Sequence, residues 1–231
     1  MSIQLETNEH SVEVIPVQKT LIEWGQTNFR VFPWRMTRDP YKILLSEIML
    51  HRTQARQVVP VYESFIQIYP DIRSLSQAGK EELNAILYSL GLRWRIDLIQ
   101  DMACELANHY NGDIPQDKED LLSLPGVSEY IAGAVRCFAW NLPEAIPDTN
   151  TVRITGRLFC LTIKKSSRRN PLFRHLIAGL VPSDQPRAFN YAQLDLAHQV
   201  CTSKHPPDCS HCPLLQWCCY GNSTITQKQQ G

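Results

Sequence analysis

The stretch Leu124-Pro125-Gly126-Val127-Ser128-Glu129-Tyr130 lies between two segments with helical spacing. In the second segment, apolar residues recur every three or four positions, as they do on one face of a helix: Ile131, Ala134, Val135 and Phe138. Gly126 permits a positive φ, so a tight turn can open that helix. The N–H groups at a helix start favour an anion such as phosphate. The stretch therefore predicts a hairpin that either holds a phosphate or simply connects two helices.

Helical spacing also dominates the rest of the chain. It marks segments at about 17–29, 43–51, 58–69, 80–90, 96–110, 118–123, 129–140, 151–161, 171–180 and 187–200. No stretch shows the clean alternation that is typical of a strand. Residues 1–13 and 221–231 are polar and lack periodicity, so we expect both ends to be frayed. The pattern predicts an all-α protein of about ten short helices.

Length and composition place the chain among globular proteins. Its 231 residues, 43% of them hydrophobic, suffice for a substantial core in one compact unit or two small interleaved lobes. The first thirty residues lack a basic start followed by an apolar run, and no stretch approaches the roughly 18 to 20 apolar residues of a membrane span. We expect a soluble intracellular protein without a membrane partner, cytoplasmic if the source is a prokaryote.

The formal net charge is zero, which at first argues against a nucleic-acid partner. The charge is nevertheless unevenly distributed. Between Thr149 and Ser183 there is no acidic residue, and seven residues are basic: Arg153, Arg157, Lys164, Lys165, Arg168, Arg169 and Arg174. Such a stretch fits a solvated face as well as a DNA-binding surface.

The cysteines indicate a metal site. Three of the eight are isolated, whereas five crowd within nineteen positions: Cys201, Cys209, Cys212, Cys218 and Cys219. This clustering is typical of metal binding rather than of disulfides. Four thiolates can surround zinc or an iron-sulfur cluster, and the single short knuckle from Cys209 to Cys212 favours iron. We interpret Cys219 as a spare, free thiol beside the ligands Cys201, Cys209, Cys212 and Cys218.

Four stretches resemble one family. Residues 124–130, followed eighteen residues later by Asp148 in a proline-containing loop, resemble the helix-hairpin-helix and Gly/Pro-Asp signature of DNA glycosylases. Residues 32–35 and 39–50 resemble the opening of the branch that contains MutY adenine glycosylases and Mig-type thymine glycosylases, and residues 189–201 resemble its last helix before the cluster. The resemblance extends in unbroken order over about residues 17–219.

The resemblance implies a two-lobed, all-α architecture. A six-helix barrel lobe with the hairpin would span 36–142, and a helical lobe with the loop of a [4Fe-4S] cluster would span 143–222. The N-terminal helix, within 11–35, would pack with the cluster lobe. The expected partner is double-stranded DNA with a mismatched or damaged base, bound by a monomer.

The chain departs from the family at two places. Ser128 stands where the hairpin usually has a second glycine, which affects the expected backbone geometry. Seven residues separate Cys201 from Cys209, where the family usually has six. One extra loop residue is easily absorbed, so the predicted ligand set is unchanged.

Two carboxylates are candidates for the chemistry. Breaking an N-glycosidic bond builds positive charge on the sugar, which Asp148 could stabilise directly or while activating water. Capping the helix that begins near Thr151 is the alternative for this residue. Glu47 interrupts an apolar helical face; the resemblance implies contact with the departing base, and a salt bridge with Arg35 or Arg52 is the alternative.

Tyr130 is the most discriminating position. In the family that the chain resembles, bifunctional glycosylase-lyases have a lysine at this position, and the amine of that lysine forms a Schiff base with the sugar. Mig-type enzymes have a tyrosine there. Tyr130 therefore indicates a monofunctional enzyme, unless it is a packing aromatic. The resemblance further implies DNA contacts from the hairpin residues Gly126, Val127 and Ser128 and from a second group: His51, Arg52 and Gln54. Arg52 would fill the gap left by an extruded base.

These observations favour a glycosylase that removes thymine or uracil opposite guanine. An adenine glycosylase acting opposite guanine or 8-oxoguanine is the alternative within the family. Two alternatives lie outside this chemistry, namely a catalytically silent lesion-binding module and a zinc-stabilised structural protein.

Overall fold

The computed structural model describes residues 2–4, 11–51, 53–91 and 96–229. Contacts between Cα atoms divide the chain into two compact units. The terminal unit combines the described residues up to Arg30 with those from Asn141 onward, and the central unit spans Val31–Trp140. The chain thus leaves the terminal unit once, forms the whole central unit, and returns.

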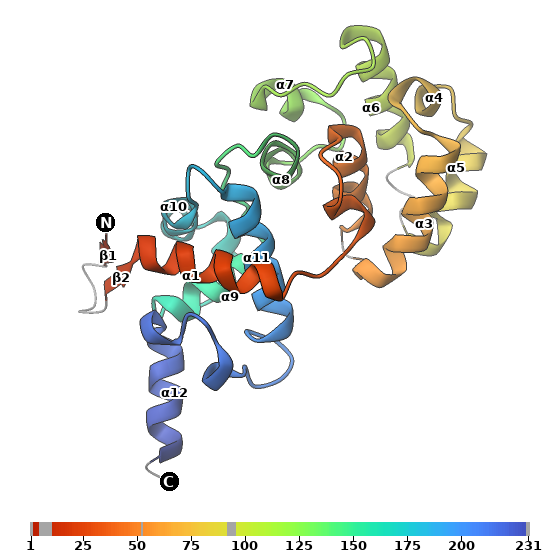
Figure 1. Ribbon diagram of the computed structural model, residues 1–231. Coiled ribbons are helices and arrows are strands. Elements are labelled where there is room, and N and C mark those ends of the chain that lie inside the picture. The colour runs from red at the N-terminus through yellow and green to blue at the C-terminus, as the bar shows by residue number, and fades with distance from the viewer. Residues whose placement is uncertain (1, 5–10, 52, 92–95, 230–231) are drawn as a thin grey trace. The chain divides into compact units, whose positions relative to one another are not determined.

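The central unit is entirely helical among its described residues (Figure 1). Its α-helices are α2 (Pro40–Met49), α3 (Ala55–Ile68), α4 (Ile72–Ser76), α5 (Lys80–Leu87), α6 (Ile96–His109), α7 (Lys118–Ser123) and α8 (Glu129–Trp140). Two 3-10 turns, η1 (Pro33–Arg35) and η2 (Tyr88–Leu90), complete it. The largest side chains of its core are fully buried: Tyr62, Phe65 and Phe138. The helical spacing of the sequence predicted all of these α-helices except the five-residue α4.

Aspartates set the starts of several helices in this unit. Asp39 accepts the Tyr41 N–H at 3.0 Å and precedes a proline at the first helical position of α2. Asp71 accepts the Ser74 N–H at 2.8 Å, and the Ser74 hydroxyl accepts the Asp71 N–H in return. Each such cap contributes about 1 kcal/mol. Short helices such as α4 depend on these caps because they form few internal hydrogen bonds.

The terminal unit contains the remaining elements. They are β1 (Ser2–Gln4), β2 (Ser11–Glu13), α1 (Val14–Thr27), α9 (Thr149–Leu158), η4 (Ser167–Arg169), α10 (Pro171–Leu180), α11 (Pro186–Gln199), η5 (Cys209–His211), η6 (Leu215–Trp217) and α12 (Cys219–Gln229). Helices α1 and α11 cross closely at Gly25, where an added Cβ would lie 2.6 Å from the Ala192 Cβ. Their crossing therefore requires glycine at this position, and it closes a core around Leu21, Phe159 and Phe189.

The sequence-based expectation that both ends are frayed is wrong for their described residues, which form regular structure. Strand β1 pairs antiparallel with β2, and Val12 is fully buried in the core of the terminal unit. The indole of Trp217 donates to the Glu13 carboxylate at 3.2 Å, which joins β2 to η6. Helix α12 also continues where a frayed tail was expected. Three-residue strands are too short to show alternation, and a polar helix lacks the apolar stripe from which helices are recognised.

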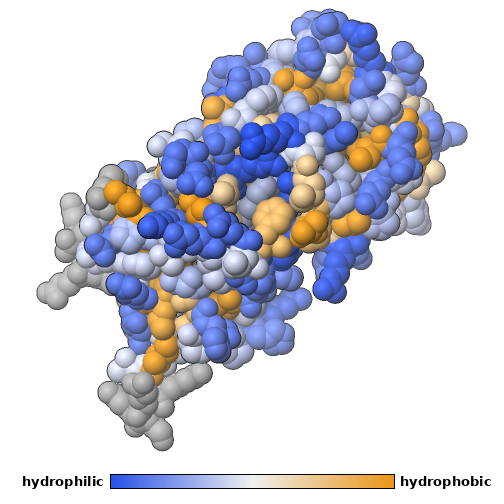
Figure 2. Space-filling view, viewed as in Figure 1, coloured by the Kyte–Doolittle hydropathy of each residue, from blue (hydrophilic) through white to orange (hydrophobic). Residues whose placement is uncertain are grey.

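One face of the surface is predominantly polar. Figure 2 shows hydrophilic side chains over most of the face in view, with apolar side chains interspersed. In the part of the chain that the structure describes, no helix combines the length and the apolar character needed to cross a membrane. The apolar faces of the amphipathic helices pack instead in the cores of the two units.

Candidate active site and cysteine cavity

The predicted hairpin is formed by α7, the turn after it, and α8. Gly126 has a φ of +78°, in the left-handed region that favours glycine. The Val127 N–H donates to the Leu124 carbonyl at 3.2 Å and closes the turn. Ser128, where the family usually has glycine, accepts the Ile131 N–H on its hydroxyl at 3.3 Å. Serine therefore replaces the glycine as the cap of α8, with the turn of Gly126 preserved.

The central unit also holds the other base-pocket candidates. Glu47 lies on α2 and is only 6% exposed, and half-buried Tyr130 lies in the first turn of α8. Helices α2 and α8 pack against each other, so the fold brings the two elements together. His51 follows α2 and is half-buried, whereas Gln54 is exposed at the start of α3. Arg52 lies outside the described residues.

Asp148 belongs to the terminal unit, where it caps α9. Its Oδ1 accepts the Asn150 N–H at 2.8 Å and the Thr151 N–H at 2.7 Å. Its Oδ2 accepts the Asn150 amide Nδ2 at 2.8 Å. Desolvation raises the pKa of Asp148, and these hydrogen bonds only partly oppose that effect. Asp148 therefore does cap α9, as the alternative interpretation predicted. The same hydrogen bonds hold its desolvated carboxylate in one orientation.

A hydrogen-bonded chain connects Asp148 to the first predicted cluster ligand. The Asn150 Oδ1 accepts from the Arg153 Nη2 at 3.1 Å. Arg153 also donates from Nε to the Cys201 carbonyl at 2.8 Å and from Nη2 to the Ala197 carbonyl at 3.0 Å. Sequence analysis missed this role of Asn150 and Arg153. Only the basic character of the stretch pointed to Arg153, because its partners are backbone atoms more than forty positions away.

The four predicted cluster ligands line one cavity in the terminal unit. Cys201, Cys209, Cys212 and Cys218 share it with Arg157, Val200, Pro207, Leu215, Tyr220 and Gly221. Among the described residues, no group of three cysteine, histidine or acidic side chains is arranged to hold a single metal ion. The four cysteines therefore border one common space.

The cavity also provides hydrogen bonds to sulfur. Arg157 donates from Nη1 to the Cys201 Sγ at 3.1 Å, and the Gly221 N–H donates to the Cys218 Sγ at 3.4 Å. Burial raises the pKa of Cys212 to about 12 and that of Cys218 to about 11. Four neighbouring thiolates therefore require a positively charged centre among them. The donor set thus fits an iron-sulfur cluster, whose iron atoms supply that charge.

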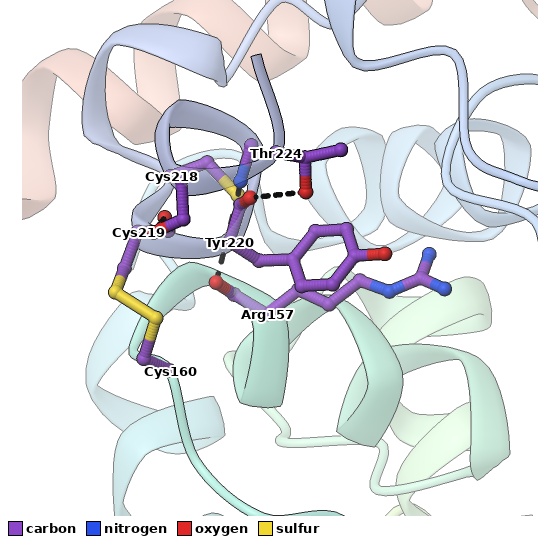
Figure 3. Close-up of a disulfide and its surroundings, with 8 residues drawn as sticks. Arg157, Cys160, Cys218, Cys219, Tyr220 and Thr224 are labelled. Atoms are coloured by element: carbon purple, nitrogen blue, oxygen red, sulfur yellow. Dashed lines mark hydrogen bonds between the residues drawn. A yellow bond between two sulfur atoms is a disulfide. The ribbon is translucent and has the colours of Figure 1, made fainter. Parts of the chain in front are cut away.

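Cys219 is not the spare thiol that the sequence predicted. It forms a disulfide with Cys160, which follows α9 (Figure 3). The expectation of a free thiol was wrong because it considered only cysteines close to Cys219 in the sequence. Its partner, Cys160, lies 59 positions away. Cys219 is thereby removed from the set of possible cluster ligands.

Comparisons with known proteins identify relatives. A family model described as the helix-hairpin-helix motif matches residues 109–138. The thymine-DNA glycosylase of Aeropyrum pernix is 38% identical over 216 residues, which cover 90% of this chain and 95% of that protein. The thymine/uracil-DNA glycosylase of Pyrobaculum aerophilum is 37% identical and matches 90% of this chain and 92% of its own. A solved structure of a thermostable thymine-DNA glycosylase has a TM-score of 0.84 at 31% identity, covering 90% of this chain and 95% of that one.

Proposed function

This chain belongs to the helix-hairpin-helix DNA glycosylases, and we propose that it removes thymine or uracil from mismatches with guanine during base excision repair. The relatives that act on thymine or uracil are matched over nearly their whole length. The observation that carries the chemistry is the desolvated carboxylate of Asp148, held in one orientation at the start of α9.

Asp148 has the properties that the reaction requires. As the bond between C1′ and the base nitrogen breaks, positive charge develops on the sugar. A fixed, desolvated carboxylate stabilises that charge more strongly than a hydrated one. Water then forms the new bond to C1′, and the proton that it loses passes to the carboxylate. The base must leave the helical stack for this chemistry, which is why a binding pocket is needed.

We assign the base pocket to Glu47 and Tyr130. A buried carboxyl group on α2 suits a hydrogen bond to the departing base. Tyr130 carries no amine, so it cannot form the Schiff base that permits strand cleavage. The proposed enzyme is therefore monofunctional. The turn at Gly126, Val127 and Ser128 would hold a DNA phosphate at the start of α8, while His51, Arg52 and Gln54 would contact the DNA near the extruded base.

We further propose that Cys201, Cys209, Cys212 and Cys218 hold a [4Fe-4S] cluster. Their common cavity and the single short knuckle from Cys209 to Cys212 favour a cluster over one zinc ion. The cluster would supply a fixed positive centre that orders the loop between α11 and α12. None of the steps at the sugar requires it, so its role is to shape the terminal unit.

Base release from four duplexes tests the activity. With thymine or uracil opposite guanine, we expect abasic sites that become strand breaks only after alkali treatment. With adenine opposite guanine or 8-oxoguanine, we expect none. Release of adenine instead would assign the chain to the alternative class. Tight binding to mismatched duplex without release of any base would show that it is a lesion-binding module.

Metal analysis tests the cofactor. Protein purified without oxygen is expected to contain about four iron atoms per chain and to absorb visible light. Cys212→Ser should lose most of that iron, whereas Cys104→Ser should retain it, because Cys104 lies in the central unit. Stoichiometric zinc without iron would contradict the cluster and favour a zinc-stabilised unit.

A further inference from the structure

The disulfide lies beside the last proposed cluster ligand. Cys219 directly follows Cys218 and begins α12, whereas Cys160 follows α9 in the left-handed conformation, with a φ of +53°. Figure 3 shows the bond spanning from the end of α9 to the first turn of α12. The covalent link therefore joins the end of the cysteine loop to a helix of the core.

The same two segments are also connected by weaker contacts. The Cys218 Sγ donates to the Arg157 carbonyl at 3.5 Å, and the Arg157 guanidinium lies over the Tyr220 ring at 5.0 Å. Arg157, Cys218 and Tyr220 all line the cysteine cavity. Figure 3 shows them near the disulfide. The thiol hydrogen bond would be lost when Cys218 binds a cluster as a thiolate, and the cation–π pair contributes about 1 kcal/mol. The disulfide is therefore the strongest link between α9 and this turn.

Helix α12 also packs against α9, η5 and η6. From Cys219 to Thr226, only Gly221 is buried. Gly221 packs against the Leu215 side chain, where an added Cβ would lie 2.9 Å from Cδ1. Of the described side chains beyond this first turn, Asn222, Ser223 and Thr226 are exposed, and the Thr224 hydroxyl donates to the Tyr220 carbonyl of the same helix at 2.8 Å. Cys218 itself packs against the core of the terminal unit, and the disulfide adds a covalent link at the next residue.

We propose that the Cys160–Cys219 disulfide is a redox-sensitive clasp that retains the cluster by fixing Cys218. The inference rests on the proposed cluster at the four cysteines. A dithiol reductant would attack Cys160, which is exposed, and pass through a mixed disulfide. The reductant becomes a disulfide, and Cys160 and Cys219 each end as thiols, so two electrons and two protons are transferred. The first turn of α12 is then released together with Cys218.

The location of the disulfide allows a reductant to act on it selectively. Cys218 lines the cavity, but Cys160 and Cys219 do not. A reductant can therefore open the clasp from outside without contact with the cluster. A cysteine in a disulfide cannot also bind the cluster. In the oxidised protein, Cys218 is therefore the cluster ligand of the two adjacent cysteines, and Cys219 is not.

Iron release from the intact holoprotein tests the clasp. An iron chelator is added in excess, and loss of visible absorbance is followed with and without a dithiol reductant. We expect release to be about tenfold faster after reduction, comparable to the loss of an outer-shell partner. Cys160→Ser and Cys219→Ser should release iron at the fast rate without reductant. Cys104→Ser, which removes a thiol from the central unit, should behave as the wild type.

Two controls separate this inference from the proposed activity. Mass spectrometry must show that the reductant adds two hydrogens to the wild type, and circular dichroism must show that the variants remain helical. Equal release rates in oxidised, reduced and substituted proteins would overturn the clasp and leave the cluster intact. Protein without iron would overturn the cluster and the clasp together. Base release from mismatched duplexes, measured in parallel, is an independent readout of the glycosylase proposal.

Discussion

Asp148→Asn is expected to slow base release by about 10²–10³-fold while leaving the protein folded. The substitution removes the negative charge that we assign to stabilising the sugar. It retains the backbone cap, because an asparagine Oδ1 can accept the same N–H groups of Asn150 and Thr151, but it loses the Oδ2 acceptor of the Asn150 side chain. Single-turnover base release from a duplex with thymine opposite guanine measures the chemistry, and thermal unfolding measures the cap.

Asp71→Asn provides a matched control. Asp71 forms the same reciprocal capping box with Ser74 that Asp148 forms with Thr151, but it caps α4 in the central unit. We expect this variant to retain its helix cap and wild-type base release. Residual activity of Asp148→Asn within a few-fold of the wild type would show that Asp148 is only a cap.

The pH profile gives a second test of Asp148. Burial raises its pKa above the ordinary value of 3.8, and the proposed role requires the deprotonated form. Wild-type base release should therefore decline on acidification at a pH above 3.8. Asp148→Asn should lack this decline, because amides do not titrate in that range.

Much of the helical framework followed from the sequence. Periodicity predicted the α-helices from α1 to α11 except α4, and the comparisons confirm the family that the hairpin and its following aspartate indicated. The five-residue α4 and the polar α12 were missed because neither displays an apolar stripe over enough turns. The strand pair was missed because burial of Val12 depends on the core that it meets, which no local pattern encodes.

Interactions in the site between residues far apart in the sequence could not be predicted. Asp148 could be singled out because its position after the hairpin and before a helix is local information. The bonds of Arg153 to backbone carbonyls and the pairing of Cys160 with Cys219 depend on tertiary packing. Backbone acceptors have no sequence signature, so these connections emerge only once α9 is placed against the cysteine loop.

Arg153→Met is expected to impair both stability and base release. Arg153 donates to the carbonyls of Ala197 and Cys201 and to the Asn150 side chain. Methionine has a similar length but no donor, so partly buried acceptors lose their partner at a cost of about 1–3 kcal/mol each. Thermal unfolding should therefore show a clear loss of stability, and base release should fall by about tenfold or more because Asn150 no longer holds Asp148 firmly.

The pH profile distinguishes positioning from stability alone. The Asn150 side chain lowers the pKa of Asp148 through its bond to Oδ2, against the larger effect of burial. If Arg153 keeps Asn150 in place, Arg153→Met should raise the Asp148 pKa further and shift the acidic decline of base release to higher pH. Arg153→Lys should show the same shift, because a single ammonium cannot reproduce the planar fork that reaches four acceptors.

Arg73→Met is the matched control for this prediction. Arg73 bonds to the Asn111 side chain at 2.8 Å, as Arg153 bonds to Asn150, but the pair is exposed and lies in the central unit. We expect it to leave both the stability and the pH profile nearly unchanged. If Arg153→Met lowered base release equally at all pH values, in proportion to the unfolded fraction, Arg153 would only support the fold. A shifted acidic decline in Arg153→Lys as well, which keeps the positive charge that interacts with Asp148, would instead show that the hydrogen-bonded chain from the cysteine loop sets the protonation of Asp148, when measured where the variant is fully folded.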